Sequence, residues 1–267
     1  MRILAVVAVN VFKESVRDKV LYNLVVFAVL LISISYLLGQ LTAGQDLKII
    51  KDLGLAAIAT FGLLIAVFIG IGLVWKEVEK KSIYSLLSKP IQRPQFVLGK
   101  YLGLLLTLAV NITVMTIAFY ALLAYIGWRS SPEAARAWPA PPADPQLLKA
   151  IVLIACELSL VTAIALFFST FSTPFLSAVL TLGVWVIGHF NDDLRNLGAL
   201  AGPSAGWIGR ILYYVLPNFA AFDVKAQVVH AQPVPLAYVG LTMAYALMYV
   251  ALVVTGAVMI FSRRDFK

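Results

Sequence analysis

The chain has 267 residues, of which 61% are hydrophobic and 13% are charged, whereas ordinary soluble domains contain roughly 45–50% apolar and about 25% charged residues. So few charged side chains cannot cover the exterior of a soluble domain of this length, which leaves lipid as the solvent for most of the surface. The net charge of +8 does not indicate nucleic-acid binding, because the basic residues lie between long apolar runs and not in one patch with stacking aromatics. The composition therefore predicts an integral membrane protein with no nucleic-acid partner.

Residues 1–20 join a short apolar stretch to the charged run Phe12-Lys13-Glu14-Ser15-Val16-Arg17-Asp18-Lys19. A cleaved signal peptide is disfavoured, because this stretch has no strongly basic leader and another hydrophobic segment follows almost at once. We expect a retained amphipathic helix that lies on the membrane surface with its basic side chains among the lipid headgroups. The alternative is a simple polar lead-in to the first span.

Six apolar segments follow that are long enough, or nearly long enough, to cross the hydrocarbon layer as helices, which requires about 20 residues. They are residues 21–41, 53–75, 101–128, 148–170, 175–190 and 236–261, of which the fifth is short. Barrel strands are disfavoured, because no segment alternates in polarity over about ten residues. We therefore predict an all-α integral membrane protein with about six transmembrane helices and a single domain over residues 1–267.

The distribution of lysine and arginine predicts the orientation of the spans. With the N-terminus in the cytoplasm, 13 of the 21 basic residues lie on the cytoplasmic side. Both termini are then cytoplasmic, and residues 191–235 form the longer outer loop. Within that loop the apolar patch 207–217 is too short to span, and Pro203 and Pro217 mark its limits. We expect a re-entrant or interfacial helix there, and a surface loop with aromatic anchors is the alternative.

The cytoplasmic connector, residues 76–100, contains a short segment with one apolar face. Ile83, Leu86 and Leu87 fall at positions i, i+3 and i+4, so a helix presents all three side chains on one side, and Pro90 ends that helix. A lone apolar face of this kind either lies on the headgroups or fills a groove on a soluble protein. A connector that serves only as a positive-inside anchor remains the alternative.

The connector carries a resemblance to a known family. Its pattern reads Glu77-x-Glu79-x-x-Ser82-x-x-x-Leu86-Leu87-x-x-Pro90-Ile91-x-Arg93, and Gly99-Lys100 follows at the next span. This order resembles the cytoplasmic connector of the type 2 ABC transporter permeases. It is most similar to the branch associated with multi-copper enzyme maturation, such as the permease of the nitrous oxide reductase accessory system. The entry run at Phe12 and the outer Leu216-Pro217-Asn218-Phe219 add to the resemblance, which covers nearly the whole chain.

The resemblance implies the membrane subunit of a transporter in the cytoplasmic (inner) membrane of a bacterium or archaeon. Such permeases pair as homodimers or with a relative, and they bind two ABC ATPase subunits through a coupling helix in the connector. It implies contacts with the ATPase at Glu77, Glu79, Ser82, Ile83, Leu86, Leu87, Pro90 and Arg93. It also implies that the surface helix, with Phe12, Glu14 and Arg17, receives the ATP-driven motion. The chain departs from the common pattern at Lys80-Lys81-Ser82, where many relatives have a small residue before a threonine.

The chain has no ATPase motif of its own. A phosphate cradle needs Gly-x-x-x-x-Gly-Lys-Ser/Thr, but here Tyr101 follows Gly99-Lys100 and position 94 is a proline. We therefore expect no cofactor on this chain, with ATP and Mg²⁺ bound by the partner ATPase. The single Cys156 and the scattered methionines predict no metal site, and the two histidines lie too far apart in sequence to indicate a catalytic site.

Glu157 is the acidic residue within the predicted spans, and it lies near the middle of the fourth. An ionised acid at this depth costs about 2.5–3.5 kcal/mol on insertion scales, so the side chain is expected to face the protein or a water cavity. A role in substrate handling or gating is one hypothesis, and a hydrogen bond between helices is the other. The function predicted from sequence is a permease that exports a hydrophobic, lipid-linked or polymeric substrate or drives maturation outside the membrane. The alternative is an ion-coupled secondary transporter that uses Glu157.

Overall fold

The computed structural model describes residues 2–40, 46–79, 92–130, 138–191, 193–196 and 203–263. The described residues form helices joined by turns and short irregular segments, as the sequence predicts for an all-α membrane protein. In chain order the helices are α1 (Arg2–Val16), α2 (Lys19–Gln40), α3 (Asp46–Glu79), α5 (Arg93–Arg129), α7 (Gln146–Ser169), α8 (Pro174–His189), α10 (Pro203–Val215), the 3₁₀ turn η1 (Ala220–Phe222), α11 (Lys225–Val229) and α12 (Leu236–Arg263).

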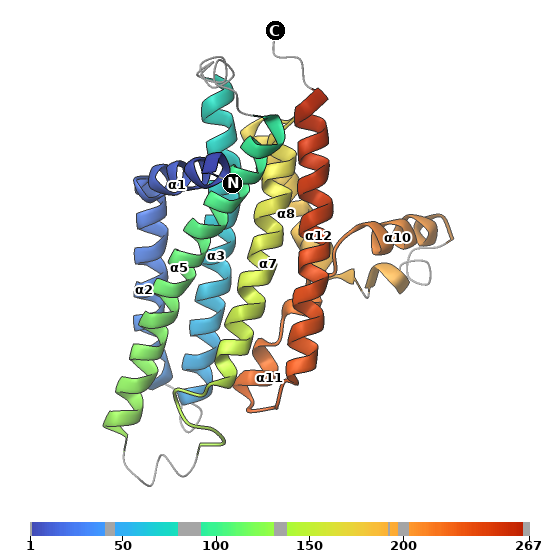
Figure 1. Cartoon of the computed structure of the whole chain (residues 1–267). Helices are drawn as coiled ribbons and strands as arrows, with labels where there is room; N and C mark the ends of the chain where they lie inside the picture. Colours follow the sequence, from blue (N-terminus) through green and yellow to red (C-terminus); the bar gives the residue numbers. More distant parts are fainter. Residues whose placement is uncertain are drawn as a thin grey trace.

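Five of the described helices are long and apolar enough to cross a membrane, namely α2, α3, α5, α7 and α12. They run alongside one another in a single bundle (Figure 1). The predicted fifth span corresponds to α8, which has 16 residues. At 1.5 Å per residue α8 is about 24 Å long, less than the ~30 Å of a typical hydrocarbon core. The described helices therefore include five long enough for a full span and one shorter apolar helix.

Helix α7 lies at the centre of the bundle and packs against α3, α5, α8 and α12. Small residues on α3 permit close contact between α3 and α7: a Cβ at Gly62 would come within 2.4 Å of Leu158, and a Cβ at Gly70 within 2.6 Å of Ala165. Because lipid provides no hydrophobic force between helices, such close packing is a main source of their association. The outward faces of α2 and α12 instead expose large apolar side chains, as contact with lipid requires.

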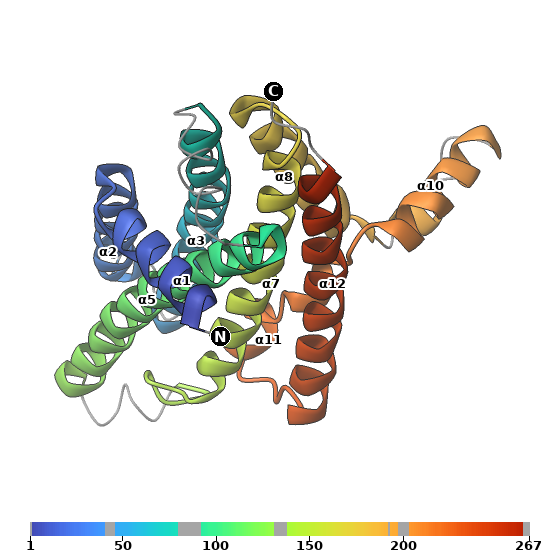
Figure 2. The same cartoon turned by 45° about the horizontal axis from the view of Figure 1, so that its top comes forward.

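The described ends of the connector lie together at one end of the bundle. Helix α3 finishes there at Glu79, α5 begins there at Arg93, and α12 ends there at Arg263 (Figure 1). We call this the connector end. Helix α1 lies near the connector end and crosses the bundle at a steep angle to the spans, as the view in Figure 2 shows. This is the arrangement expected of a helix on the membrane surface.

Two segments close the opposite end of the bundle. Residues 138–145 pack beside α3, where the Lys51 ammonium donates a hydrogen bond to the carbonyl oxygen of Pro141 at 2.9 Å. The Tyr120 hydroxyl donates to the carbonyl oxygen of Asp144 at 3.0 Å. Helix α11 packs against α3 and α7. In the described part of the predicted loop 191–235 lie α10, η1 and α11 together with helical residues at 193–196, and α10 projects sideways from the bundle (Figures 1 and 2).

Candidate functional site

Most residues of the predicted coupling segment lie outside the described part of the chain, and the residues that flank them are at the connector end. Ser82, Ile83, Leu86, Leu87 and Pro90 belong to this group, so their role stays a prediction. Glu77 and Glu79 are in the last turn of α3, and Arg93 is the first residue of α5. Pro94 at the start of α5 suits a helix beginning, where a missing backbone N–H costs nothing.

Helix α1 rests directly on the first turns of α5. Gly99 and Gly103 make this close approach possible, because a Cβ at Gly99 would come within 2.8 Å of Val7 and one at Gly103 within 2.6 Å of both the Ala8 carbonyl oxygen and Val11. Glycines four residues apart lie on one face of a helix and let a second backbone approach. The pair therefore forms a seat for α1 at the point where α5 leaves the connector.

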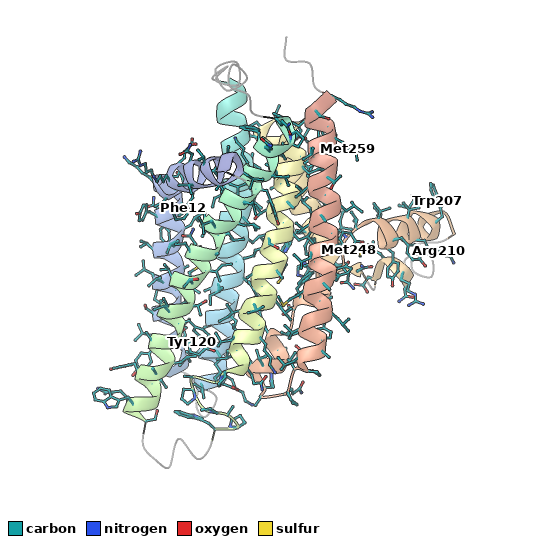
Figure 3. All side chains as sticks on the ribbon, viewed as in Figure 1. Phe12, Tyr120, Trp207, Arg210, Met248 and Met259 are labelled. Carbon is teal, nitrogen blue, oxygen red and sulfur yellow. The ribbon has the colours of Figure 1, made fainter. Side chains whose placement is uncertain are left out.

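The seat determines which face of α1 remains exposed. Val11 and Ser15 are buried, Phe12 is half-buried, and Glu14 and Arg17 are exposed (Figure 3 labels Phe12). The two predicted charged residues of the surface helix therefore point away from α5. An exposed charged face above a buried apolar one is the pattern of a helix that lies between protein or lipid on one side and water on the other.

Lys100 lies in the same turns of α5 and is almost completely buried, with 1% of its surface exposed. Its ammonium is 4.9 Å from the centre of the Phe96 ring, close enough for a cation–π interaction. Phe96 in turn stacks on Phe261 near the end of α12, with ring centres 5.7 Å apart. The Tyr101 hydroxyl donates to the Ser159 carbonyl oxygen of α7 at 3.2 Å. The start of α5 thus contacts α1, α7 and α12 within about two turns.

A second polar cluster lies inside the bundle around Glu157, which is 6% exposed. The Trp185 indole Nε1 donates a hydrogen bond to Glu157 Oε1 at 2.7 Å, and His189 Nε2 lies 3.7 Å from the same oxygen. Glu157 is about 16 Å along α7 from Gln146, so this cluster is near the middle of the span. The carboxylate therefore faces protein groups of α8, as a costly intramembrane charge must.

The segment after α10 packs against this cluster. The Phe219 ring stacks on the His189 ring with centres 5.9 Å apart, and the Phe219 backbone N–H donates to the Gly188 carbonyl oxygen at 3.0 Å. A Cβ at Gly188 would come within 2.5 Å of the Pro217 carbonyl oxygen, so the contact requires glycine at that position. The outer Pro217-Asn218-Phe219 is thus attached to the polar pair of α7 and α8.

The turn between α7 and α8 brings Glu157 and Trp185 together. Thr173 begins α8, and its side chain accepts a hydrogen bond from the Leu176 N–H at 3.5 Å, with Pro174 in the first turn. The Ser172 and Ser177 hydroxyls also form a hydrogen bond of 2.7 Å. An antiparallel hairpin with its turn at residues 170–173 places residue 157 opposite residues near 185–189, which is the observed pairing.

Comparison with known families agrees with this architecture. Residues 5–266 match the model of a family described as ABC-2 family transporter protein. The chain belongs to the ABC-2 transporter family. No curated protein sequence matches it. Membership makes it a membrane permease component of an ABC transporter; this family is a non-catalytic membrane component that pairs with ABC ATPase partners.

Several contacts of this ABC-2 permease were not singled out from the sequence as site residues. By their spacing the two histidines indicate no site, and Trp185 stands among the apolar residues of the predicted fifth span. The contacts of His189 and Trp185 both follow from the hairpin, because the Ser-Thr-Pro signal at 172–174 marks its turn. The sequence predicts Lys100 at the end of the cytoplasmic connector, but it is buried inside the bundle. The Gly99-Gly103 spacing was visible in the sequence, whereas its partner, α1, was not.

Proposed function

We propose that two copies of this permease, or one copy and a relative, form the membrane unit of a transporter that two cytoplasmic ATPase subunits drive. ATP and Mg²⁺ bind to those subunits and not to this chain. The observation that carries the proposal is the seat of α1 on Gly99 and Gly103, directly after the connector. Because one helix start receives both the connector and the surface helix, a displacement of the connector moves both together.

The contacts at the start of α5 suggest how such a displacement reaches the spans. Phe96 touches α12 through Phe261, and Tyr101 is hydrogen-bonded to α7. A push on the helix predicted around Ile83, Leu86 and Leu87 therefore acts on α5 and, through it, on α7 and α12. We assign Glu77, Glu79 and Arg93 to polar contacts around that apolar face, which contribute less because exposed ion pairs are weak.

We assign Glu157 to holding α7 against α8 rather than to binding a coupling ion. Its carboxylate already accepts the Trp185 hydrogen bond and faces His189. The connector end is cytoplasmic in this proposal, which places both termini inside the cell and is consistent with 13 of 21 basic residues on that side. The spans are apolar and α7 packs against four neighbouring helices, which favours a hydrophobic, lipid-linked or polymeric substrate moved between copies, or mechanical work in a maturation process.

Co-purification from native membranes in mild detergent tests this function. We expect an ATPase to elute with the permease, and the double variant Leu86→Asp, Leu87→Asp to lose about tenfold or more of it, because a charge buried without a partner costs several kcal/mol. Ser85→Asp is the matched control, since on the predicted helix Ser85 lies opposite the apolar face. If no ATPase elutes, or if both variants retain it equally, coupling through the connector is wrong, and an ion-coupled transporter with Glu157 becomes the alternative.

A further inference from the structure

Helix α10 has no extensive packing partner within the described chain. It projects sideways from the bundle beyond α8 and α12 in both views (Figures 1 and 2), and it packs closely against no other described helix. Its side chains are accordingly exposed: Trp207 by 60% and Tyr214 by 78%, with Ile208, Ile211 and Val215 also exposed. An amphipathic helix of 13 residues does not hold its conformation alone in water, so something covers it.

The position of α10 shows that water is not what surrounds its exposed side chains. Helix α8 is eight residues shorter than its neighbour α7, which corresponds to about 12 Å, so the chain turns sideways before it reaches the far end of the bundle. Figure 1 shows α10 beside the middle part of the bundle. In a membrane that position lies within the hydrocarbon layer.

The charged residues of α10 and of the residues before it also disfavour lipid as the surrounding medium. Asp193, Arg195 and Arg210 are all exposed, and Figure 3 shows Arg210 near Trp207 on α10. One exposed arginine at the centre of a bilayer costs about 2.5–3.5 kcal/mol on insertion scales. The first backbone N–H groups of any helix also have no partner within that helix, and at this depth lipid cannot supply one for α10. The cover is therefore protein.

The apolar surface available is sufficient for a stable dimer. Helix α8 exposes a stripe of large side chains, Phe175, Leu176, Val179, Val186, Ile187 and the following Phe190. Together with the five on α10, these eleven side chains present on the order of 1,000 Å² if each contributes about 100 Å². A stable interface needs about 800 Å² from each partner. The segment also carries both signs of charge, so two copies related by a twofold axis can place opposite charges against each other.

We propose that α10 of one copy docks on the exposed face of α8 in a second copy. A twofold axis relates the two copies, so each α10 makes the same contact. The proposal rests on the paired permease described above and names the surface through which the pair forms. Each copy then covers the arginines and helix ends of the other, and the two polar clusters at Glu157 lie on either side of the axis. Helix α2, on the other side of the bundle from α10, faces lipid.

Disulfide cross-linking in native membranes tests this surface. In a Cys156→Ala background, Ile211→Cys with Val186→Cys joins α10 to α8, and the control pair Phe27→Cys with Leu37→Cys lies on exposed α2. All four replaced side chains are exposed in the isolated chain. We expect the first pair to yield a band at about twice 29.1 kDa and the control pair to stay monomeric. A disulfide within one chain, no disulfide, or an equal dimer band from the α2 pair would overturn the proposal.

A second measurement tests this interface independently of the coupling to the ATPase. Trp207→Ala with Tyr214→Ala should raise the dissociation constant of the purified pair about tenfold or more, because aromatic anchors dominate interfaces, whereas Phe27→Ala with Leu37→Ala should not. An unchanged dissociation constant in the first variant contradicts the surface. If the ATPase elutes with a permease that gives no cross-link, the interface is wrong while the function stands. If the cross-link forms without any ATPase, the function is wrong while the interface stands.

Discussion

A side chain added at Gly103 should displace α1 from its seat. A Cβ at this position would lie 2.6 Å from the Ala8 carbonyl oxygen and 2.6 Å from the Val11 Cβ, whereas real Cβ contacts essentially never fall under 3.0 Å. The Ala8 oxygen belongs to the backbone and cannot rotate away, so α1 itself has to move. Gly240 offers a matched control in α12, because nothing lies within 4 Å of a Cβ there.

The size of the effect follows from opposing contributions. Overpacking a close contact costs about 1–3 kcal/mol, while replacing glycine by alanine inside a helix gains up to about 1 kcal/mol. Gly103→Ala should therefore lower the free energy of unfolding by about 1–2 kcal/mol, and the Gly240→Ala control should leave it unchanged or raise it. In detergent this corresponds to a fall of about 2–8 °C in Tm for Gly103→Ala.

A labelling assay reports the displacement of α1 itself. Val11 is 4% exposed, so Val11→Cys in a Cys156→Ala background should react slowly with a maleimide. The larger Gly103→Leu should accelerate this reaction, because α1 separates from α5, and Gly240→Leu should not. If Gly103→Leu leaves the labelling rate unchanged and Gly103→Ala is as stable as Gly240→Ala, α1 does not rest on α5 and the proposed path of motion is refuted.

Two further substitutions test the remaining polar contacts. Glu157→Ala leaves the Trp185 N–H without an acceptor and should cost about 1–3 kcal/mol of stability, whereas Glu157→Gln retains an oxygen and should cost less; equal Tm values would contradict the hydrogen bond. Lys51→Met removes the donor to Pro141, so hydrogen exchange of residues 138–145 should accelerate. Lys48→Met, one turn earlier in α3, is the control, and equal exchange in both variants would show that Lys51 does not hold this segment.

The spans were predictable because lipid imposes one rule on every segment that crosses it. The helix boundaries were less predictable, because a hydropathy value counts a charged residue as polar whether its side chain meets water or is buried beside protein groups. Lys100 ended the predicted connector, yet α5 begins at Arg93 and buries Lys100 beside Phe96. Lys51 lies just before the predicted second span, and the structure includes it in α3, where it is buried and hydrogen-bonded to a loop carbonyl 90 residues away. Contacts of that separation depend on the packing of whole helices.

The Glu157 cluster also combines a feature that the sequence predicts with contacts that only the packing of the helices reveals. The cost of an acid within a membrane predicts that it has a partner, and hydropathy alone does not say which one. Trp185 and His189 are separated from it by 28 and 32 residues, and only the register of the hairpin brings them together. The apolar patch before Pro217 was predicted as a re-entrant or interfacial helix, and the structure has α10 there. That α10 projects beside the bundle depends on the early end of α8.

Photo-cross-linking from Leu87 in intact native membranes tests the central claim most directly, because it asks what the predicted coupling face touches. A photoreactive amino acid replaces Leu87, and the adduct is identified by mass spectrometry, with the same residue at Ser85 as control. We predict an adduct at position 87 with a protein that carries a Gly-x-x-x-x-Gly-Lys-Ser/Thr loop, and little or none at position 85. Adducts with lipid alone, or equal yields at both positions, would contradict coupling to an ATPase through this connector.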